Sequence, residues 1–234
     1  MTFDGRHILD GELVSARPEI VIRLRDESRY LALSDTSHLD LAVRHPSGAL
    51  QSVYYTDANV QFFPADTSNL QEKNVAEIQF NPEFWEDGIY ELMVHGEDAS
   101  GNDAGDIDYR ISFEVINQAM ISNGLNYPNP FSTSTRFVFT LTGSEIPSYF
   151  KIQIMTVTGK IVREITHHEL GPMHIGVNIS DFAWDGTDEF GDPLGNGVYF
   201  YRVVARLPGE ALEHYSTSID KYFKSGWGKM WLGR

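Results

Sequence analysis

The chain has 234 residues, of which 41% are hydrophobic and 12% aromatic, as expected for a folded globular protein of one large or two ordinary domains. Its 18 Lys and Arg residues face 33 Asp and Glu residues, and the formal net charge of −15 argues against binding to nucleic acid. Cysteine is absent, which excludes disulfides, thiol nucleophiles and Cys-based zinc sites.

The charge is unevenly distributed along the chain. Residues up to Ala119 include 8 basic and 22 acidic side chains (net −14), whereas those from Met120 onward include 10 and 11 (net −1). This asymmetry predicts two domains, 1–119 and 120–234. No stretch approaches the roughly 18 apolar residues of a membrane span, and the first residues lack the pattern of a signal peptide. If the protein is exported, its export signal is therefore expected to lie elsewhere.

The first half is typical of an all-β domain. Apolar and polar residues alternate in short runs rich in β-branched and aromatic side chains, and turn residues separate the runs. The expected strands are 19–24, 39–44, 49–55, 75–80, 88–96 and 109–116. Six or seven such strands predict an immunoglobulin-like sandwich that acts as a spacer. The run 87–94 with 97–102 resembles the last hairpin of bacterial immunoglobulin-like surface modules.

Helical periodicity is missing throughout. The best exception, 66–74, is polar and is predicted as a loop or a single helical turn. Residues 117–126 are polar, contain a glycine and are predicted to link the two domains, so that the second begins near Leu125.

The second half opens with a specific motif. Its residues are Tyr127, Pro128, Asn129, Pro130 and Phe131, and Asn126 precedes them. Proline is expected to hold this segment extended, the two asparagines to bond locally to the backbone, and Tyr127 and Phe131 to serve as apolar anchors. The motif resembles the opening of the C-terminal sorting domains of type IX secretion cargo.

A second motif lies further along. Two alternating strands in 151–165 flank Gly159, which supplies the positive φ of a tight hairpin. The run 182–203 then resembles the "WDGxDxxGxxxxxGxYxYxV" pattern of the same sorting domains and of the immunoglobulin-like domain of the flagellar hook-cap protein. Its motif residues are Trp184, Asp185, Gly186, Gly191, Gly197, Tyr199 and Tyr201. Trp184 and the two tyrosines are expected in the core.

The last residues form a basic and aromatic tail, 221–234, that is predicted to be a strand. The resemblance implies that this strand belongs to an export signal, with Lys221, Lys224, Trp227, Lys229, Trp231 and Arg234 as the sorting residues. Trp227 and Trp231 either pack inward or are read by a receptor or a lipid headgroup, and the sequence leaves both readings open.

The resemblance also implies partners and a location. Such domains pass an outer-membrane translocon, meet a shuttle protein, and reach the cell surface or the exterior. The insertion between Arg206 and Lys221, and the glycine before the last Arg, depart from the pattern of cleaved cargo. An immunoglobulin-like unit followed by this variant tail resembles the end of gingipain-like (C25-type, sortase-like) cysteine peptidases.

Metal and catalytic chemistry have weaker candidates. A calcium site is conceivable at one acidic stretch, whose oxygen donors are Asp98, Asn102, Asp103, Asp106 and Asp108, although an acidic hairpin turn is the more ordinary reading. Asp185, Asp188 and Asp192 are expected to form turn hydrogen bonds. The adjacent His167 and His168 are expected on a strand, pointing to opposite faces.

No nucleophile elbow or phosphate-binding loop is present, so the fragment itself is predicted to be non-catalytic and to need no cofactor. The expected protein is thus an all-β pair of tandem immunoglobulin-like sandwiches that sorts and retains a larger exported protein. The alternative is a calcium- or carbohydrate-binding accessory module of a secreted enzyme. The sequence leaves the oligomeric state open.

Overall fold

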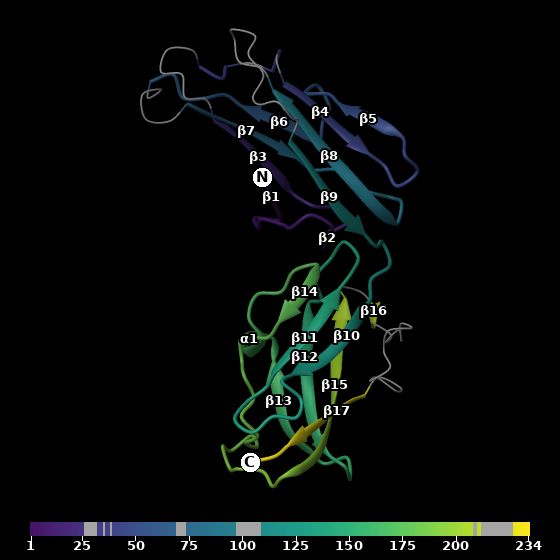
Figure 1. Cartoon of the computed structure of the whole chain (residues 1–234), viewed down its shortest axis with the longest axis vertical. Helices are drawn as coiled ribbons and strands as arrows, with labels where there is room; N and C mark the ends of the chain where they lie inside the picture. The colour runs from purple at the N-terminus through teal and green to yellow at the C-terminus, as the bar shows by residue number, and fades with distance from the viewer. Residues whose placement is uncertain are drawn as a thin grey trace. The chain divides into compact units, whose positions relative to one another are not determined.

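A computed structural model describes residues 1–25, 32–34, 36–37, 39–68, 74–96, 109–207, 210–211 and 227–234. The chain divides into two compact units, Met1–Asn117 and Gln118–Arg234. Both are sandwiches of two β-sheets (Figure 1), which confirms the expected all-β fold class.

The first unit has a four-stranded sheet in the order β1-β3-β7-β6. Its strands are β1 (Thr2–Phe3), β3 (Ile20–Arg25), β7 (Val75–Phe80) and β6 (Val60–Phe63). The facing five-stranded sheet has the order β2-β9-β8-β4-β5. Its strands are β2 (Glu12–Val14), β9 (Tyr109–Val115), β8 (Gly88–Gly96), β4 (Leu39–Arg44) and β5 (Leu50–Val53).

This order is that of an immunoglobulin domain. The first sheet follows the A-B-E-D arrangement and the second the G-F-C-C′ arrangement, with β2 parallel to β9 and its other pairs antiparallel. Tyr90 near the start of β8 donates a hydrogen bond from its hydroxyl to the Glu86 carbonyl (3.1 Å), which is the tyrosine corner of such domains. Alternate residues of both sheets meet in one core, in which Ile20, Ile78 and Phe113 are fully buried.

The sequence missed three short strands of this unit, β1, β2 and β6. They have two to four residues, too few for a period of two to stand out from noise.

The second unit pairs a three-stranded sheet with a five-stranded one. The smaller has the order β10-β11-β14, from β10 (Ile121–Tyr127), β11 (Arg136–Leu141) and β14 (Gly176–Ile179). The larger has the order β13-β12-β15-β16, with β17 also paired to β15. Its strands are β13 (Ile161–Thr166), β12 (Tyr149–Thr156), β15 (Gly197–Leu207), β16 (Glu210–Ala211) and β17 (Gly228–Leu232).

The expectations for residues 117–126 and for the two adjacent histidines were wrong. The predicted linker 117–126 contains most of β10, because those residues pair with β11 through a register shift between Ser122 and Leu125. The two adjacent histidines lie on a helical turn, α1 (His167–Leu170), and not on a strand. Thr166 and Glu169 form a capping box there, which satisfies the first free backbone amides and starts the turn.

The core of the second unit is aromatic. Trp184 is completely buried, and its ring lies 5.5 Å from that of Phe131 and 5.9 Å from that of Tyr199. Tyr199 and Tyr201 face the same interior from β15 and are 7% and 3% exposed. The expected core positions of Trp184 and both tyrosines are therefore confirmed.

Candidate functional site: the terminal strand and its contacts

The last residues of the chain form the edge strand β17 of the second unit. It runs antiparallel to β15, with Tyr201 opposite Gly228, Tyr199 opposite Met230 and Gly197 opposite Leu232. Met230 and Leu232 are 1% and 0% exposed, so they point into the core. Lys229 and Trp231 point the other way, and 51% of Trp231 is exposed. The indole of Trp231 therefore faces solvent, and it does not pack inward, which was one of the two alternatives that the sequence left open.

Gly228 allows this strand to approach Tyr201. A Cβ atom at residue 228 would lie 2.1 Å from Cζ of the Tyr201 ring, far inside contact distance. The Tyr201 hydroxyl donates to the Gly124 carbonyl (3.2 Å), which keeps the ring in place. The strand can therefore start only with a glycine at this position.

The other edge of β17 is covered by the motif 127–131. The Phe131 amide donates to the Trp231 carbonyl (3.0 Å), and the Gly233 amide donates to the Phe131 carbonyl (2.9 Å). The Asn129 side chain acts like a further piece of strand: its Oδ1 accepts from the Trp231 amide and its Nδ2 donates to the Lys229 carbonyl, both at 3.0 Å. The backbone groups on this edge are therefore satisfied within the unit.

The motif itself differs from the extended segment that was expected. The peptide bonds before Pro128 and Pro130 are both cis, and residues 128–130 form a bend. The bend is held at the Pro128 carbonyl, which accepts hydrogen bonds from the Thr135 hydroxyl (2.8 Å) and from the side-chain Nδ2 of Asn126 (3.4 Å).

Of the two apolar anchors predicted in this motif, one is confirmed and the other is not. Phe131 is 3% exposed and packs on Trp184, whereas Tyr127 is 73% exposed and anchors nothing in the core. Asn126 bonds locally, as expected, but Asn129 bonds to a strand about a hundred residues further along the chain.

Arg234 is fixed by two loops. The Asn196 side chain accepts from the Arg234 amide (3.0 Å) and donates to its carbonyl (3.1 Å). The guanidinium donates to the Asp185 carbonyl (2.6 Å). Gly186 has φ +80°, and a Cβ there would lie 2.8 Å from the Leu232 side chain, so the glycine of the "WDG" motif makes room for the last strand. The two sequence motifs and the C-terminal residues thus meet in one place.

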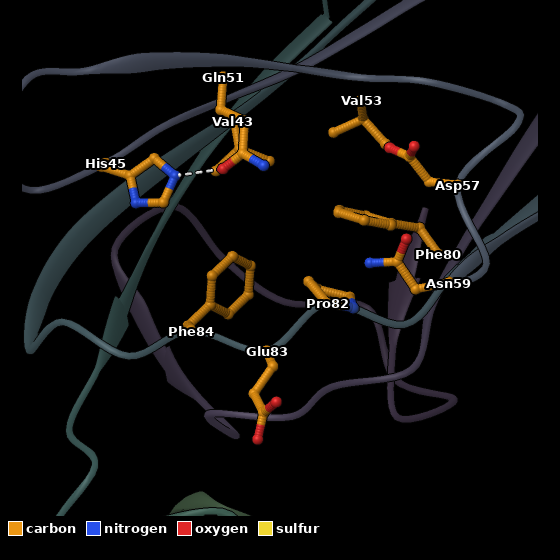
Figure 2. A pocket seen from close by; sticks show the side chains of 10 residues that line it. All are labelled: Val43, His45, Gln51, Val53, Asp57, Asn59, Phe80, Pro82, Glu83 and Phe84. Carbon is orange, nitrogen blue, oxygen red and sulfur yellow. Dashed lines mark hydrogen bonds between the residues drawn. The ribbon is translucent and has the colours of Figure 1, made fainter.

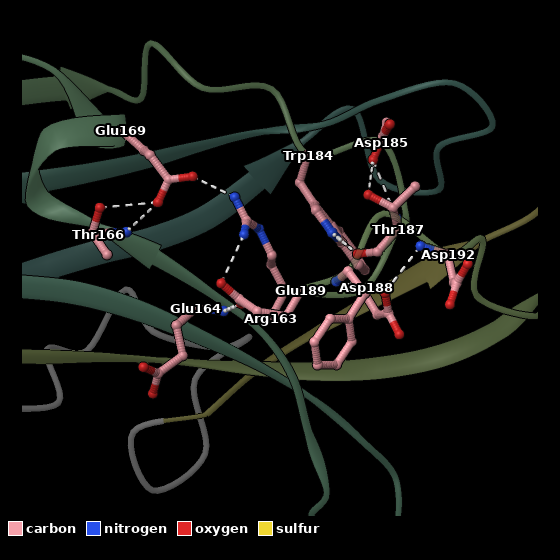
Figure 3. A network of polar contacts seen from close by, with 11 residues as sticks. Arg163, Glu164, Thr166, Glu169, Trp184, Asp185, Thr187, Asp188, Glu189 and Asp192 are labelled. Atoms are coloured by element: carbon pink, nitrogen blue, oxygen red, sulfur yellow. Dashed lines mark hydrogen bonds and ion pairs between the residues drawn. The ribbon is translucent and has the colours of Figure 1, made fainter.

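The acidic loop after Trp184 is built from turn hydrogen bonds (Figure 3). Asp185 Oδ1 accepts from the Thr187 amide (3.1 Å) and hydroxyl (2.7 Å), and these bonds, with help from Arg234, hold the pKa of the Asp185 carboxyl below its usual value. Asp188 Oδ1 accepts from the amides of Phe190 and Asp192. The expected turn role is confirmed for the side chains of Asp185 and Asp188, whereas Asp192 takes part through its backbone. Gly159, Gly191 and Gly197 also have positive φ.

An arginine ties this loop to the sheet. Arg163 on β13 forms ion pairs with Glu169 of α1 and with Glu189 (3.0 Å), as Figure 3 shows. Glu189 in turn accepts from the Glu164 amide (3.1 Å). With 16% of its side chain exposed, Arg163 fixes both segments by charge-assisted bonds.

A network of hydrogen-bonded polar side chains lies on the outward face of the large sheet, next to Trp227. Arg202 lies 5.1 Å from the Trp227 ring and donates to the Gln153 carboxamide (2.7 Å). Gln153 donates to Glu164, which also accepts from Lys151 (2.8 Å). The hydrogen bond from Lys151 lowers the pKa of Glu164, and the same bond raises the pKa of Lys151. Trp227 is half-buried against this network.

The first unit contains a small pocket (Figure 2). Both apolar and polar side chains line it, and His45 and Gln51 share a hydrogen bond of 2.8 Å. The lining residues are Val43, His45, Gln51, Val53, Asp57, Asn59, Phe80, Pro82, Glu83 and Phe84. Its cavity volume of about 80 Å³ is far below the several hundred Å³ of usual ligand sites.

Other sequence candidates lie outside the described residues. These are Lys221, Lys224 and the whole calcium set, Asp98, Asn102, Asp103, Asp106 and Asp108. Within the described part of the chain, no group of three or more His, Asp or Glu side chains is arranged to hold a metal ion. No helix in that part has the length and hydropathy needed to cross a bilayer.

The sequence reasoning missed three residues of the site, Asn196, Arg202 and Gly228. Their partners lie between 27 and 49 residues away in the sequence, at Arg234, Gln153 and Tyr201. No local pattern marks these contacts, because each joins residues that are far apart in the sequence.

The fold and the site together define a tandem pair of immunoglobulin-like β-sandwiches whose last strand is clamped between two sequence motifs. No protein-family model matches the chain, and no curated protein matches it. Among solved structures, the chain is similar to the crystal structure of dimeric latent PorU from Porphyromonas gingivalis, with 18% sequence identity and a TM-score of 0.37 over 98% of this chain. The chain spans 19% of the length of that protein, and a likeness of this size assigns no function.

Proposed function

We propose that this chain is the sorting and surface-retention end of a larger exported bacterial protein, recognised by a type IX secretion system. The second unit carries the signal, and the first is an immunoglobulin-like spacer. The proposed partners are the outer-membrane translocon and its shuttle protein, and the proposed location is the cell surface or the exterior.

The observation that carries the proposal is the arrangement of the terminal residues. Residues 228–234 are joined to both motifs that resemble those of sorting domains, through Asn129 on one side and Asp185 on the other. Trp231 leaves half of its surface in solvent, on the same face of β17 as Lys229. Tryptophan is enriched at recognition surfaces relative to the rest of a protein surface.

The remaining functional assignments follow from the same proposal. The fragment acts by binding and not by catalysis, and it works without a cofactor. The parent protein is proposed to be a gingipain-like cysteine peptidase, in line with the order of its two C-terminal units.

Surface display of a reporter tests the proposal. A signal peptide and a fluorescent protein are fused in front of residues 1–234 and expressed in a bacterium with a type IX system and in its translocon-null strain. The reporter is expected at the surface of the first strain alone, and removal of residues 228–234 is expected to trap it in the periplasm. Display that is absent from both strains, or that survives the deletion, contradicts the proposal.

A further inference from the structure

The outward face of the large sheet in the second unit has a charge opposite to that of the protein. Cross-strand pairing places the outward side chains of β12, β15 and β17 on one surface. Its charged residues on these three strands are Lys151, Arg202, Arg206 and Lys229. Among the described residues of β12, β13, β15 and β17, Glu164 of β13 is the acidic residue on this face, and it is bonded to Lys151. The formal charge of the whole chain is −15, so this cationic surface is a local exception.

Apolar side chains lie at one end of this surface, and the cations follow them along β15. Val198 lies opposite Trp231 and Phe200 opposite Lys229, and both are partly exposed on the same face as the indole. On the next strand, Met155 is opposite Phe200. Trp231, at 51% exposure, is the most prominent side chain of this row. Tryptophan and arginine are the residue types enriched in binding hot spots, and Trp231 and Arg202 lie on this one face.

The edge of β17 that does not pair with β15 cannot accept a further strand. An incoming strand would need the Trp231 amide and the carbonyls of Lys229 and Trp231, and these groups are bonded to Asn129 and Phe131. Strand addition, a common way to recognise a terminal segment, is therefore blocked at this edge. What remains available for contact is the outward side chains.

We propose that a protein partner reads the terminal strand in its folded place, through the outward face formed by Trp231, Lys229, Phe200 and Arg202. The partner surface offers an apolar pocket for the Trp231 indole, with carboxylates around it for Lys229 and Arg202. Complementary charge favours this partner, because an acidic rim is attracted to the cationic surface and repelled by the rest of the chain. This inference rests on the proposed sorting function and names the surface through which it works.

The test uses single substitutions in the displayed reporter with residues 1–234 intact. Trp231→Ala and Lys229→Glu are expected to lower surface display about tenfold or more, because truncation of the aromatic residue removes a binding hot spot. Val177→Ala is the matched control, since Val177 is 56% exposed on β14 of the other sheet. Equal thermal unfolding of the purified variants verifies that the fold is kept.

The possible outcomes distinguish failure of the proposed recognition surface from failure of the proposed sorting function. If wild-type protein is displayed, deletion of residues 228–234 blocks display, and both Trp231→Ala and Lys229→Glu are displayed like wild type, the inference is overturned and the sorting function stands. If wild-type protein is not displayed, the proposed function itself fails.

Two other occupants are tested with purified protein. Binding to vesicles of phosphatidylcholine and phosphatidylglycerol, with a Trp231-dependent shift in tryptophan fluorescence, would assign the surface to an anionic membrane and overturn the inference. Dimers in light scattering that Trp231→Ala abolishes would assign it to a second copy and overturn it as well. The expected result is a protein that stays monomeric and does not bind the vesicles.

Discussion

The hydroxyl of Tyr199 donates a 2.7 Å hydrogen bond to the carbonyl of Gly195, four residues earlier. Tyr90 of the first unit makes the equivalent bond to Glu86, at 3.1 Å. Each tyrosine lies two residues after a glycine at the start of the strand that pairs with the last strand of its unit. The two units therefore use one device to fix the turn that precedes this strand.

Removal of the Tyr199 hydroxyl tests this device. Tyr199→Phe is expected to destabilise the second unit by about 1–2 kcal/mol, since it leaves the Gly195 carbonyl without its donor while keeping the buried ring. Urea unfolding of the full chain measures the change. Tyr90→Phe serves as the parallel variant and should shift the transition of the first unit instead. Unchanged unfolding of both variants would show that the corner contributes nothing.

A side chain at residue 228 is expected to expel the terminal strand. Gly228→Ala places a Cβ against the rigid Tyr201 ring, so β17 must move, at a cost of about 1–3 kcal/mol or more. Hydrogen exchange at the Trp231 and Gly233 amides should accelerate. Gly195→Ala is the matched control, because a Cβ atom added at residue 195 would meet no neighbouring atom within 4 Å. The steric argument is refuted if both variants exchange alike.

The inward and outward residues of β17 should differ in what they control. Met230→Ala empties a core position that is 1% exposed and is expected to cost about 2–5 kcal/mol. Trp231→Ala changes a half-exposed side chain and should leave unfolding nearly unchanged while lowering surface display. Denaturant unfolding and the display assay, run on both variants, check this separation. A large loss of stability in Trp231→Ala would instead make Trp231 a packing residue.

Glu164 is expected to contribute to stability in a pH-dependent way. Its folded pKa is lowered from 4.5, mainly by hydrogen bonds from Lys151 and Gln153. A lowered folded pKa means that the unfolded chain binds the proton more readily, so the stabilisation is present above about pH 4.5 and is lost as the pH falls through the folded value. Glu164→Gln should therefore lower stability at pH 7 and flatten the acid limb of the stability curve. Glu145→Gln, at an exposed position of the same unit, should leave that limb as it is.

Local pattern was enough to predict much of the fold. Alternation of period two identified the longer strands, and glycine next to aspartate identified the turns after Trp184. The burial of Trp184, Tyr199 and Tyr201 followed from their place on one strand face and beside its turn. These features depend on residues close together in the sequence, so the sequence alone determined them.

Tertiary structure decided where the two motifs and the tail meet. Asn129 bonds to Trp231 and Asn196 to Arg234, and both pairs are separated by many residues that carry no periodic signal. The capping box at Thr166 starts a helical turn at His167 and His168, where two adjacent residues are too few to predict a strand. The tail was predicted to be a strand, but the sequence could not tell which of its faces is buried, since Met230, Trp231 and Leu232 are all apolar. Only the pairing with β15 and the steric fit of Gly228 on Tyr201 turned Met230 and Leu232 inward and left Trp231 outside.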